Sequence, residues 1–430
     1  MKSSKKLASL LIPMLLLLSM LLTSCDPFYG GLFDPDEQSS TPSQSETQSQ
    51  APENESASAG EQGSEGILPE GEAGTADLSH ASAHALRSVA MVVACFSPQK
   101  GSTTTHYSYG TAVLYSVDTE GGAFFVTNYH VVYDQYAAKG VTPVSSEIYL
   151  YLYGKTLEAY AINASFVGGS SFYDLAVLYV PTCDVLSDAL ADGSVTPVTV
   201  ADSDAIFPGD TALAIGCPTS TDIGGFSVTR GIVSVESEYI DMTAIDSSAT
   251  VTMRVIRTDT AVNSGNSGGG LFNARGELIG IVNAKSIVTD IDGIGYAIPS
   301  NVVRAIADNI VDYCYEKDCN TVMRCILGIT VTVNGQRTEY DEESGRILRY
   351  EDVCVTAVGK GTLADGLFLA DDVIESITVG DRTVTVTRQH HLIDAMLDAR
   401  PSDEVTFLLR RGDKKVSFTV VITENCLTAY

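Results

Sequence analysis

Apolar and polar residues alternate in short runs over the middle of the chain, from about residue 85 to residue 300. Turn-forming residues separate these runs, a pattern typical of half-buried strands joined by tight connections. The strands predicted in this way lie at residues 106–117, 121–132, 145–154, 174–181, 211–218, 226–237, 250–260, 276–285 and 293–300. Many short strands with little helical pattern among them indicate an antiparallel barrel or sandwich of roughly 220 residues.

A period of 3.6 residues replaces the strand pattern at residues 300–318 and predicts a helix that closes this domain. We expect Ser300 to be its N-cap. Its apolar positions are Val303, Ile306, Ile310 and Tyr313. From about Cys325 the pattern predicts a second β-rich unit, with one clear helix at residues 390–399.

The first 24 residues differ from the rest, because lysines are followed by an apolar run from Leu7 to Leu22. This is the pattern of a secretory signal peptide. The run ends in Leu-Thr-Ser-Cys25, which resembles the lipobox of bacterial lipoproteins, and the resemblance implies that residues 1–24 are removed and Cys25 is lipidated. An uncleaved anchor helix is the alternative. Either interpretation places the rest of the chain outside the cytoplasm on a membrane, and a diacyl anchor would hold it stably.

Residues 25–82, which begin with the lipidated Cys25, are expected to be a disordered acidic tether. Residues 26–79 contain twelve acidic residues, no lysine or arginine, and many serines, glutamines, glycines and prolines. Such a composition cannot bury enough apolar surface to offset the entropy lost on ordering. Removal of residues 1–24, with three lysines and no acid, takes the formal charge from −28 to −31. We therefore expect neither nucleic acid nor anionic lipid headgroups as partners.

Eight cysteines follow Cys25, and an exported chain could pair them. Their spacings include no C-x-x-C pair and no zinc signature. Cys314 and Cys319 lie on the predicted helix, too far round it for an easy bridge. We predict that most of the eight are free, and we expect no metal and no cofactor.

The strip NSGNSGGGL, residues 263–271, contains four glycines and joins two predicted strands. It is not a P-loop, because no lysine follows the glycines, and it lacks the spacing of a dinucleotide-binding loop. The Gly-x-Ser-x-Gly sequence around Ser267 matches the nucleophile elbow of α/β-hydrolases. That elbow needs a following helix and a later histidine, whereas a strand follows here and the later histidines, His390 and His391, lie in the second unit. The remaining interpretation is a structured turn that presents Ser267.

A nucleophilic serine at this position would need a general base upstream. The earlier histidines are His80, His84, His106 and His130. Only His130 ends an apolar strand, where a half-buried imidazole needs a hydrogen-bond partner. Asp174 begins another apolar strand, and a carboxylate there is costly unless a donor such as an imidazole N–H binds it. A histidine merely satisfied in the core is the alternative, but the order His130, Asp174, Ser267 is that of the two-barrel serine proteases.

Four segments follow one another along the chain: TNYHVV, YDLAVL, IRTDTAVNSGNSGGGLFNARGELIGIVNA and GIGYAIPSNVV. They are similar, in this order, to the signatures of the HtrA (DegP-like) family of trypsin-fold proteases. The resemblance implies a chymotrypsin-like double β-barrel over residues 83–318. It also implies that His130 is the general base, that Asp174 orients it, and that Ser267 attacks the peptide carbonyl. The backbone N–H groups of Gly265 and Ser267 would form the oxyanion hole.

The chain departs from the family pattern near the proposed nucleophile. Relatives usually have proline where Ser264 and Gly270 stand, and commonly asparagine where Cys217 stands. None of these positions takes part in proton transfer. In this family the loop can rest collapsed and be ordered by an activator, so its rigidity is expected to matter for regulation.

The resemblance also places the primary substrate pocket. The strand that contains Ile281, Asn283 and Ala284 would line it, and Ala261 stands where tryptic enzymes carry an acid. Such a pocket would favour small or medium aliphatic side chains before the cleaved bond. Asp259 lies close enough in sequence to leave this preference open.

Residues 325–430 resemble a PDZ domain, an α+β unit with a helix and two closing strands. The segment ILGITVTV resembles its carboxylate-binding loop and the adjoining strand. The N–H groups of Leu327, Gly328 and Ile329 would then bind a C-terminal carboxylate while the strand pairs with the peptide. A plain core strand is the alternative, because residues 334–352 lengthen the region unusually.

Taken together, these features predict a mainly β, membrane-tethered, extracytoplasmic serine endopeptidase with one PDZ domain, acting on unfolded or damaged envelope proteins. The family resemblance implies a homotrimer. Two other functions stay open: a PDZ peptide-binding or holdase protein without proteolytic activity, and a signalling protease dedicated to a single substrate.

Overall fold

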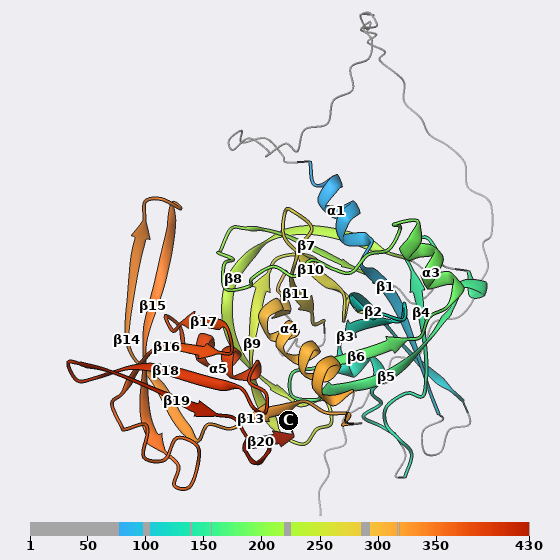
Figure 1. Ribbon diagram of the computed structural model, residues 1–430. Helices are drawn as coiled ribbons and strands as arrows, with labels where there is room; N and C mark the ends of the chain where they lie inside the picture. Colours follow the sequence, from blue (N-terminus) through green and yellow to red (C-terminus); the bar gives the residue numbers. More distant parts are fainter. Residues whose placement is uncertain are drawn as a thin grey trace, which may run out of the picture. The chain divides into compact units, whose positions relative to one another are not determined.

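The computed structural model describes the chain from Asp77 onward, apart from short gaps (Figure 1). The described residues are 77–97, 104–137, 140–155, 157–218, 225–284, 293–315, 317 and 319–429, and they belong to one compact unit. The predicted signal peptide, Cys25 and nearly all of the predicted tether lie outside them. None of the helices in these ranges is long and apolar enough to cross a membrane.

The first six strands close into an antiparallel barrel in the order β1-β2-β3-β6-β5-β4. They are β1 (Val89–Phe96), β2 (His106–Val117), β3 (Ala123–Thr127), β4 (Glu147–Leu152), β5 (Ile162–Ser170) and β6 (Leu175–Val180). β1 pairs with β2 on one side and with β4 on the other, so no edge of this sheet is left open. Apolar side chains fill the interior, among them Phe125, Leu150 and Leu178.

The next six strands close into a second antiparallel barrel in the order β10-β11-β12-β9-β8-β7. They are β7 (Thr211–Gly216), β8 (Ser227–Thr243), β9 (Thr250–Thr258), β10 (Gly270–Phe272), β11 (Leu278–Val282) and β12 (Gly295–Pro299). Its interior contains Ile256, Leu271 and Val282, all of them buried. The candidate nucleophile loop is the connection between β9 and β10, so both of its ends are fixed by strands of this barrel.

A separate apolar cluster joins the two barrels to each other and to the helices that cover them. Helix α1 (Ser79–Leu86) belongs to it, because Ala81 and Ala85 are buried there. The prediction of a tether as far as residue 82 is therefore wrong at its end, since residues 79–82 are helical. The alanines of this short segment bury enough surface against the barrels to order it, unlike the acidic residues before it.

Helix α4 (Ser300–Asp308) packs against β11 and β12 of the second barrel and β6 of the first. Its predicted apolar positions Val303, Ile306 and Ile310 are buried. The prediction that Ser300 is the N-cap is wrong, because Pro299 holds that position. Ser300 is fully buried and its Oγ donates a hydrogen bond to the carbonyl oxygen of Ala201 instead, 2.6 Å away. The helix continues as a π-helical segment, η2 (Asn309–Cys314).

The C-terminal unit is a six-stranded sheet with one α-helix and a small two-stranded sheet, in agreement with the predicted β-rich unit. The six strands are β14 (Ile329–Asp341), β15 (Arg346–Val358), β16 (Val373–Val379), β17 (Arg382–Thr385), β18 (Glu404–Arg411) and β19 (Lys414–Val421). The helix is α5 (Gln389–Leu397), and the small sheet pairs β13 (Met323–Cys325) with β20 (Leu427–Ala429). The unusual segment 334–352 extends β14 and β15 into a long hairpin, and β14 is an edge strand of the sheet.

Each of the nine predicted strand segments contains a strand, so the prediction of a mainly β barrel domain is confirmed. The patterning did not predict β1, β5 or helix α3 (Asp184–Ala191). β1 is almost wholly buried and therefore does not alternate.

Two 3-10 turns, η1 (Glu158–Tyr160) and η3 (Glu424–Cys426), also belong to the described secondary structure. The eight cysteines after Cys25 are all free in the structure, as predicted for most of them.

Candidate active site

A buried carboxylate and an imidazole meet between β3 and β6 of the first barrel. His130 lies in the short helix α2 (Tyr129–Val132), which follows β3 directly, so the strand predicted to include it ends at Thr127. The Nδ1 of His130 lies 2.6 Å from Oδ2 of Asp174, and the backbone N–H of His130 donates to Oδ1 over 2.9 Å. Because a carboxylate accepts on both oxygens, Nδ1 carries the proton and Nε2 presents its lone pair away from Asp174.

Asp174 is fully buried directly before β6, as the sequence predicted. Its backbone has φ = 50°, a left-handed conformation that costs a non-glycine residue energy and that neighbouring contacts must enforce. The side-chain amide of Asn128 donates to its carbonyl oxygen over 2.8 Å. That of Asn283 donates to Oδ2 over 2.9 Å. With His130, these bonds fix the position of the carboxylate and satisfy both of its oxygens.

Asn283 was predicted to line the substrate pocket, and the structure gives it a different contact. Its side chain is 1% exposed, and its amide bonds to Asp174 from the end of β11 in the second barrel. The carboxylate of the first barrel is thus held partly by the second. No sequence signal distinguished an asparagine that supports an acid from one that lines a pocket.

The loop of Ser267 is a compact turn that only glycine can form at two of its positions. Gly265 has φ = 95° and Gly268 has φ = 82°, both in the region that disfavours a Cβ. A Cβ on Gly265 would lie 2.1 Å from the carbonyl oxygen of Cys217, and one on Gly268 would lie 2.1 Å from that of Thr111. The glycines of this strip therefore have a structural cause, and the interpretation as a structured turn is confirmed.

Thr111 of β2 binds the nucleophile loop from the opposite barrel. Its N–H donates to the carbonyl oxygen of Ser267 over 2.8 Å, and its Oγ1 donates to that of Gly265 over 2.8 Å. The N–H of Cys217 donates to the same Oγ1 over 2.9 Å. Thr111 is fully buried, and no pattern in the sequence pointed to it, because a threonine in a strand carries no chemical signature.

The backbone N–H groups of Gly265 and Ser267 have no acceptor among the described residues. The neighbouring amides of the turn do have partners: the N–H of Asn266 donates to Asn263 over 3.0 Å and that of Gly268 to Val282 over 3.0 Å. Two unused donors beside a serine are what an oxyanion hole requires. The same residues include no hydrogen bond between Ser267 Oγ and the ring of His130, and Ser267 is 5% exposed.

The other predicted pocket residues are not all accessible. Ile281 is fully buried in the core of the structure, so its prediction as a pocket residue is wrong. Ala261 is exposed, and Ala284 is partly exposed next to residues outside the described ranges. Oδ1 of Asp259 accepts the N–H of Ile232 over 2.6 Å, so this acid is engaged by β8.

The predicted carboxylate-binding loop lies directly before the edge strand β14. Gly328 has φ = 88°, and its carbonyl oxygen accepts the N–H of Gly359 over 2.8 Å. The carbonyl oxygen of Leu327 accepts the N–H of Ala364 over 3.1 Å, and the Leu327 side chain is buried in the core of this unit. Within the described chain the N–H groups of Leu327 and Gly328 have no acceptor, and Ile329 opens β14. The loop is thus fixed by its carbonyls and has two free donors.

No group of three metal-binding side chains lies at this site within the described ranges. The one such group there consists of Asp204, His390 and His391, in which the ligand atoms lie within 4.8 Å of one another. These histidines belong to α5, and the sequence pattern had indicated only that they are not partners of Ser267.

The chain is similar in sequence to known trypsin-like serine proteases. The family of the trypsin-like peptidase domain matches residues 110–281. The chain is 34% identical over 216 residues to serine protease Do-like HtrA of Bacillus subtilis (strain 168), covering 50% of this chain and 42% of that protein. It is 30% identical over 326 residues to serine protease Do-like HtrA of Lactococcus lactis subsp. cremoris (strain MG1363), covering 74% of this chain and 71% of that protein. Among solved structures, the HtrA-type protease AlgW with tripeptide is 25% identical, with 82% of this chain and 97% of that chain covered and a TM-score of 0.49.

Proposed function

Since the chain belongs to the Do-like HtrA family of serine proteases, we propose that it is an endopeptidase whose catalytic residues are His130, Asp174 and Ser267. The observation that carries the proposal is the 2.6 Å contact between His130 Nδ1 and the fully buried carboxylate of Asp174. A buried carboxylate so close to Nδ1 fixes the tautomer in which Nε2 can accept a proton. The glycine-rich turn of Ser267 supplies the hydroxyl.

In the proposed reaction Nε2 of His130 takes the proton of Ser267 Oγ as Oγ attacks the substrate carbonyl carbon. Asp174 stays ionised and stabilises the imidazolium through the Nδ1–H bond. The proton then passes from Nε2 to the nitrogen of the leaving amine. Water attacks the acyl-enzyme in a second cycle that uses the same base.

The N–H groups of Gly265 and Ser267 are the proposed donors to the oxyanion. Their lack of an acceptor among the described residues supports this role, because the hydrogen bonds remain available for the transition state. The bonds from Thr111 to the carbonyl oxygens of Ser267 and Gly265 hold the two residues that carry the proposed donors. The N–H of Gly269 donates to the carbonyl oxygen of Asn266 over 2.9 Å and so helps to orient the peptide unit that contains the Ser267 N–H.

We propose unfolded or damaged envelope proteins as the substrates, offered as extended segments. Ala261 is exposed and Asp259 is bonded to β8, so the proposed pocket is expected to accept small or medium aliphatic side chains. At the C-terminal PDZ-like sheet, free C-termini of peptides would bind to Leu327, Gly328 and Ile329 and extend the sheet along β14. Such binding would regulate the peptidase, and trimer formation is a further proposal from the family.

For location we propose lipid anchoring at Cys25 on the outer side of the bacterial cell membrane. The support is the signal-peptide and lipobox pattern of the first 25 residues. A coil of the length of the acidic segment has a root-mean-square span of about 40 Å, enough to hold the barrels clear of the lipid surface. Its negative charge would extend it further.

Digestion of unfolded casein by the full chain tests the activity. We expect wild type to cleave casein and Ser267→Ala to lose about a millionfold in turnover. Ser264→Ala is the matched control, because Ser264 is an exposed serine of the same turn, and it should keep activity. Equal cleavage by wild type and Ser267→Ala would contradict the proposal.

Two outcomes would favour the other functions. Absence of cleavage, even with a peptide that ends in a free apolar C-terminus, would favour a peptide-binding or holdase protein. Cleavage of one or very few proteins in a mixture of denatured envelope proteins would indicate a signalling protease with a dedicated substrate. A general quality-control peptidase should degrade many of them.

A further inference from the structure

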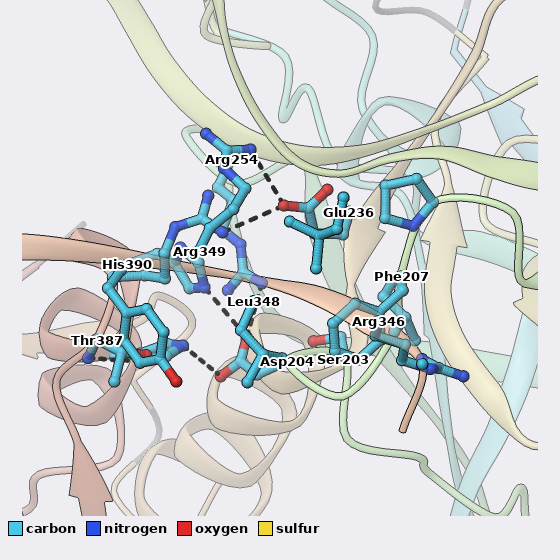
Figure 2. Close-up of a pocket in the computed structure, with 17 residues that line it drawn as sticks. Ser203, Asp204, Phe207, Glu236, Arg254, Arg346, Leu348, Arg349, Thr387 and His390 are labelled. Carbon is cyan, nitrogen blue, oxygen red and sulfur yellow. Dashed lines mark hydrogen bonds and ion pairs between the residues drawn. The ribbon is translucent and has the colours of Figure 1, made fainter. Parts of the chain in front are cut away.

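A cavity of about 570 Å³ lies where the C-terminal unit meets the second barrel, lined by residues from both (Figure 2). Asp204 comes from the segment before β7, and His390 and His391 come from the first turn of α5. The side chains of Asp204 and His390 are both among the sticks that line the cavity in Figure 2. None of these residues belongs to the proposed peptidase site.

One ligand atom from each of the three side chains lies within 4.8 Å of the others, close enough for them to converge on one metal ion. His390 Nε2 lies 3.4 Å from Asp204 Oδ1, and His391 Nε2 lies 3.9 Å from Asp204 Oδ2. Ligands at 2.0–2.2 Å from a tetrahedral zinc ion lie roughly 3.4 Å from one another. The two imidazole rings are nearly perpendicular, with an interplanar angle of 87°, so the rings approach without stacking.

Bonds on the far side of the rings orient them for binding. Nδ1 of His391 lies 3.0 Å from the carbonyl oxygen of Thr385 and 3.3 Å from the backbone nitrogen of Thr387, so two backbone groups hold this ring on the side away from Asp204. Nδ1 of His390 contacts the hydroxyl of Ser237 at 3.4 Å. Partners of this kind hold metal-binding histidines in place.

The charged side chains around the cavity are compatible with a bound cation. Arg254 forms ion pairs with both Asp204 and Asp394. These three side chains together carry one net negative charge when both acids are ionised. On the other wall three arginines are balanced by three acidic residues. They are Arg346, Arg349 and Arg388 with Asp210, Glu236 and Glu351.

We propose that Asp204, His390 and His391 bind one Zn²⁺ ion, with the fourth position open to the cavity for water or another donor. Two imidazoles and one carboxylate are a common donor set for zinc and are poorly suited to Mg²⁺ or Ca²⁺, which prefer oxygen. Since Asp204 belongs to the barrel segment and the histidines to α5, the ion fastens this helix to the second barrel. The sequence did not predict the site, because its ligands follow no metal-binding spacing.

Zinc titration of the full chain, freed of metal with a chelator, tests the proposal by calorimetry. Wild type should bind one equivalent of Zn²⁺ and show no binding of Mg²⁺. The double variant His390→Gln and His391→Gln should bind at least tenfold more weakly. His106→Gln is the matched control, because His106 pairs with Asp134 elsewhere in the structure, and it should bind like wild type.

A second readout separates this site from zinc bound to cysteines. Co²⁺ in the proposed site should give a spectrum without a thiolate charge-transfer band, and Zn²⁺ should raise the melting temperature of wild type but not of the double variant. If the double variant does not fold, the single variant His391→Gln must show the same weakening. Equal zinc affinity of wild type and the histidine variants, or no stoichiometric binding by wild type, would overturn the proposal.

Discussion

The N–H of Thr111 in the first barrel donates a hydrogen bond to the carbonyl oxygen of Ser267 in the second, over 2.8 Å. The hydroxyl of the same threonine donates to Gly265 and accepts from Cys217. One residue of the first barrel, through its backbone N–H and its hydroxyl, therefore binds both residues proposed to supply the oxyanion donors. The geometry of the nucleophile turn depends on the barrels staying together as much as on the turn itself.

Thr111→Val should weaken both stability and activity. It keeps the shape of the side chain but removes the hydroxyl, which leaves the carbonyl oxygen of Gly265 and the N–H of Cys217 unsatisfied in a buried place. We expect a loss of about 1–3 kcal/mol in the free energy of unfolding, measured with urea. Thr111→Ser keeps the hydroxyl and should retain most of the casein activity that the valine variant loses; equal activities would contradict the role of the hydroxyl.

Asn283→Ala tests whether this residue supports Asp174 or lines the pocket. Removal of its amide leaves Oδ2 of Asp174 with one donor fewer, so we expect kcat to fall roughly ten- to a hundredfold because the imidazole is less well oriented. KM for a peptide substrate should change little. A change confined to KM would instead support the pocket role that the sequence analysis assigned to it.

Gly265→Ala should be severely impaired. The left-handed backbone and the carbonyl oxygen of Cys217, 2.1 Å from the added Cβ, force the turn to move. Loss of one oxyanion donor costs about 10²–10³-fold in kcat. Ser264→Ala changes the preceding residue without this conflict, so comparable kcat values for the two variants would show that the turn does not position a catalytic donor.

Cys217 should resist alkylation in the folded protein. Burial raises the pKa of its thiol to about 12, so the reactive thiolate is scarce at pH 8 and becomes common only as the pH approaches that value. Peptide mass spectrometry after iodoacetamide treatment at pH 8 should find Cys217 unmodified and the partly exposed Cys183 modified. Both should react in urea, and rapid modification of native Cys217 would show that the turn opens.

The sequence identified the residues that are energetically costly to bury without a hydrogen-bond partner. Asp174 begins one apolar strand and His130 follows another, so each was expected to need a partner, and the two are bonded to each other in the structure. The glycines around Ser267 likewise predicted a turn that needs a left-handed backbone. Long apolar alternation predicted most strands of both barrels.

The sequence could not predict contacts between distant segments when the residues involved carry no chemical signature. Thr111 and Asn283 are polar residues of strands and their ends, and only the pairing of the two barrels brings them to the site. Asp204 meets His390 only because the long hairpin and α5 lie against the second barrel. The local periodicity of apolar residues indicates which face of a strand is buried. It does not indicate which side chain from a distant segment will lie opposite that face.

Labelling with a fluorophosphonate, followed by peptide mass spectrometry, tests the central claim most directly. Such a reagent forms an adduct with a serine only where a base activates the hydroxyl. We expect a single adduct on Ser267 in wild type and labelling at least a hundredfold slower in His130→Ala, because the base is then missing. An adduct on another residue, or labelling of Ser267 at the same rate in His130→Ala, would contradict the account.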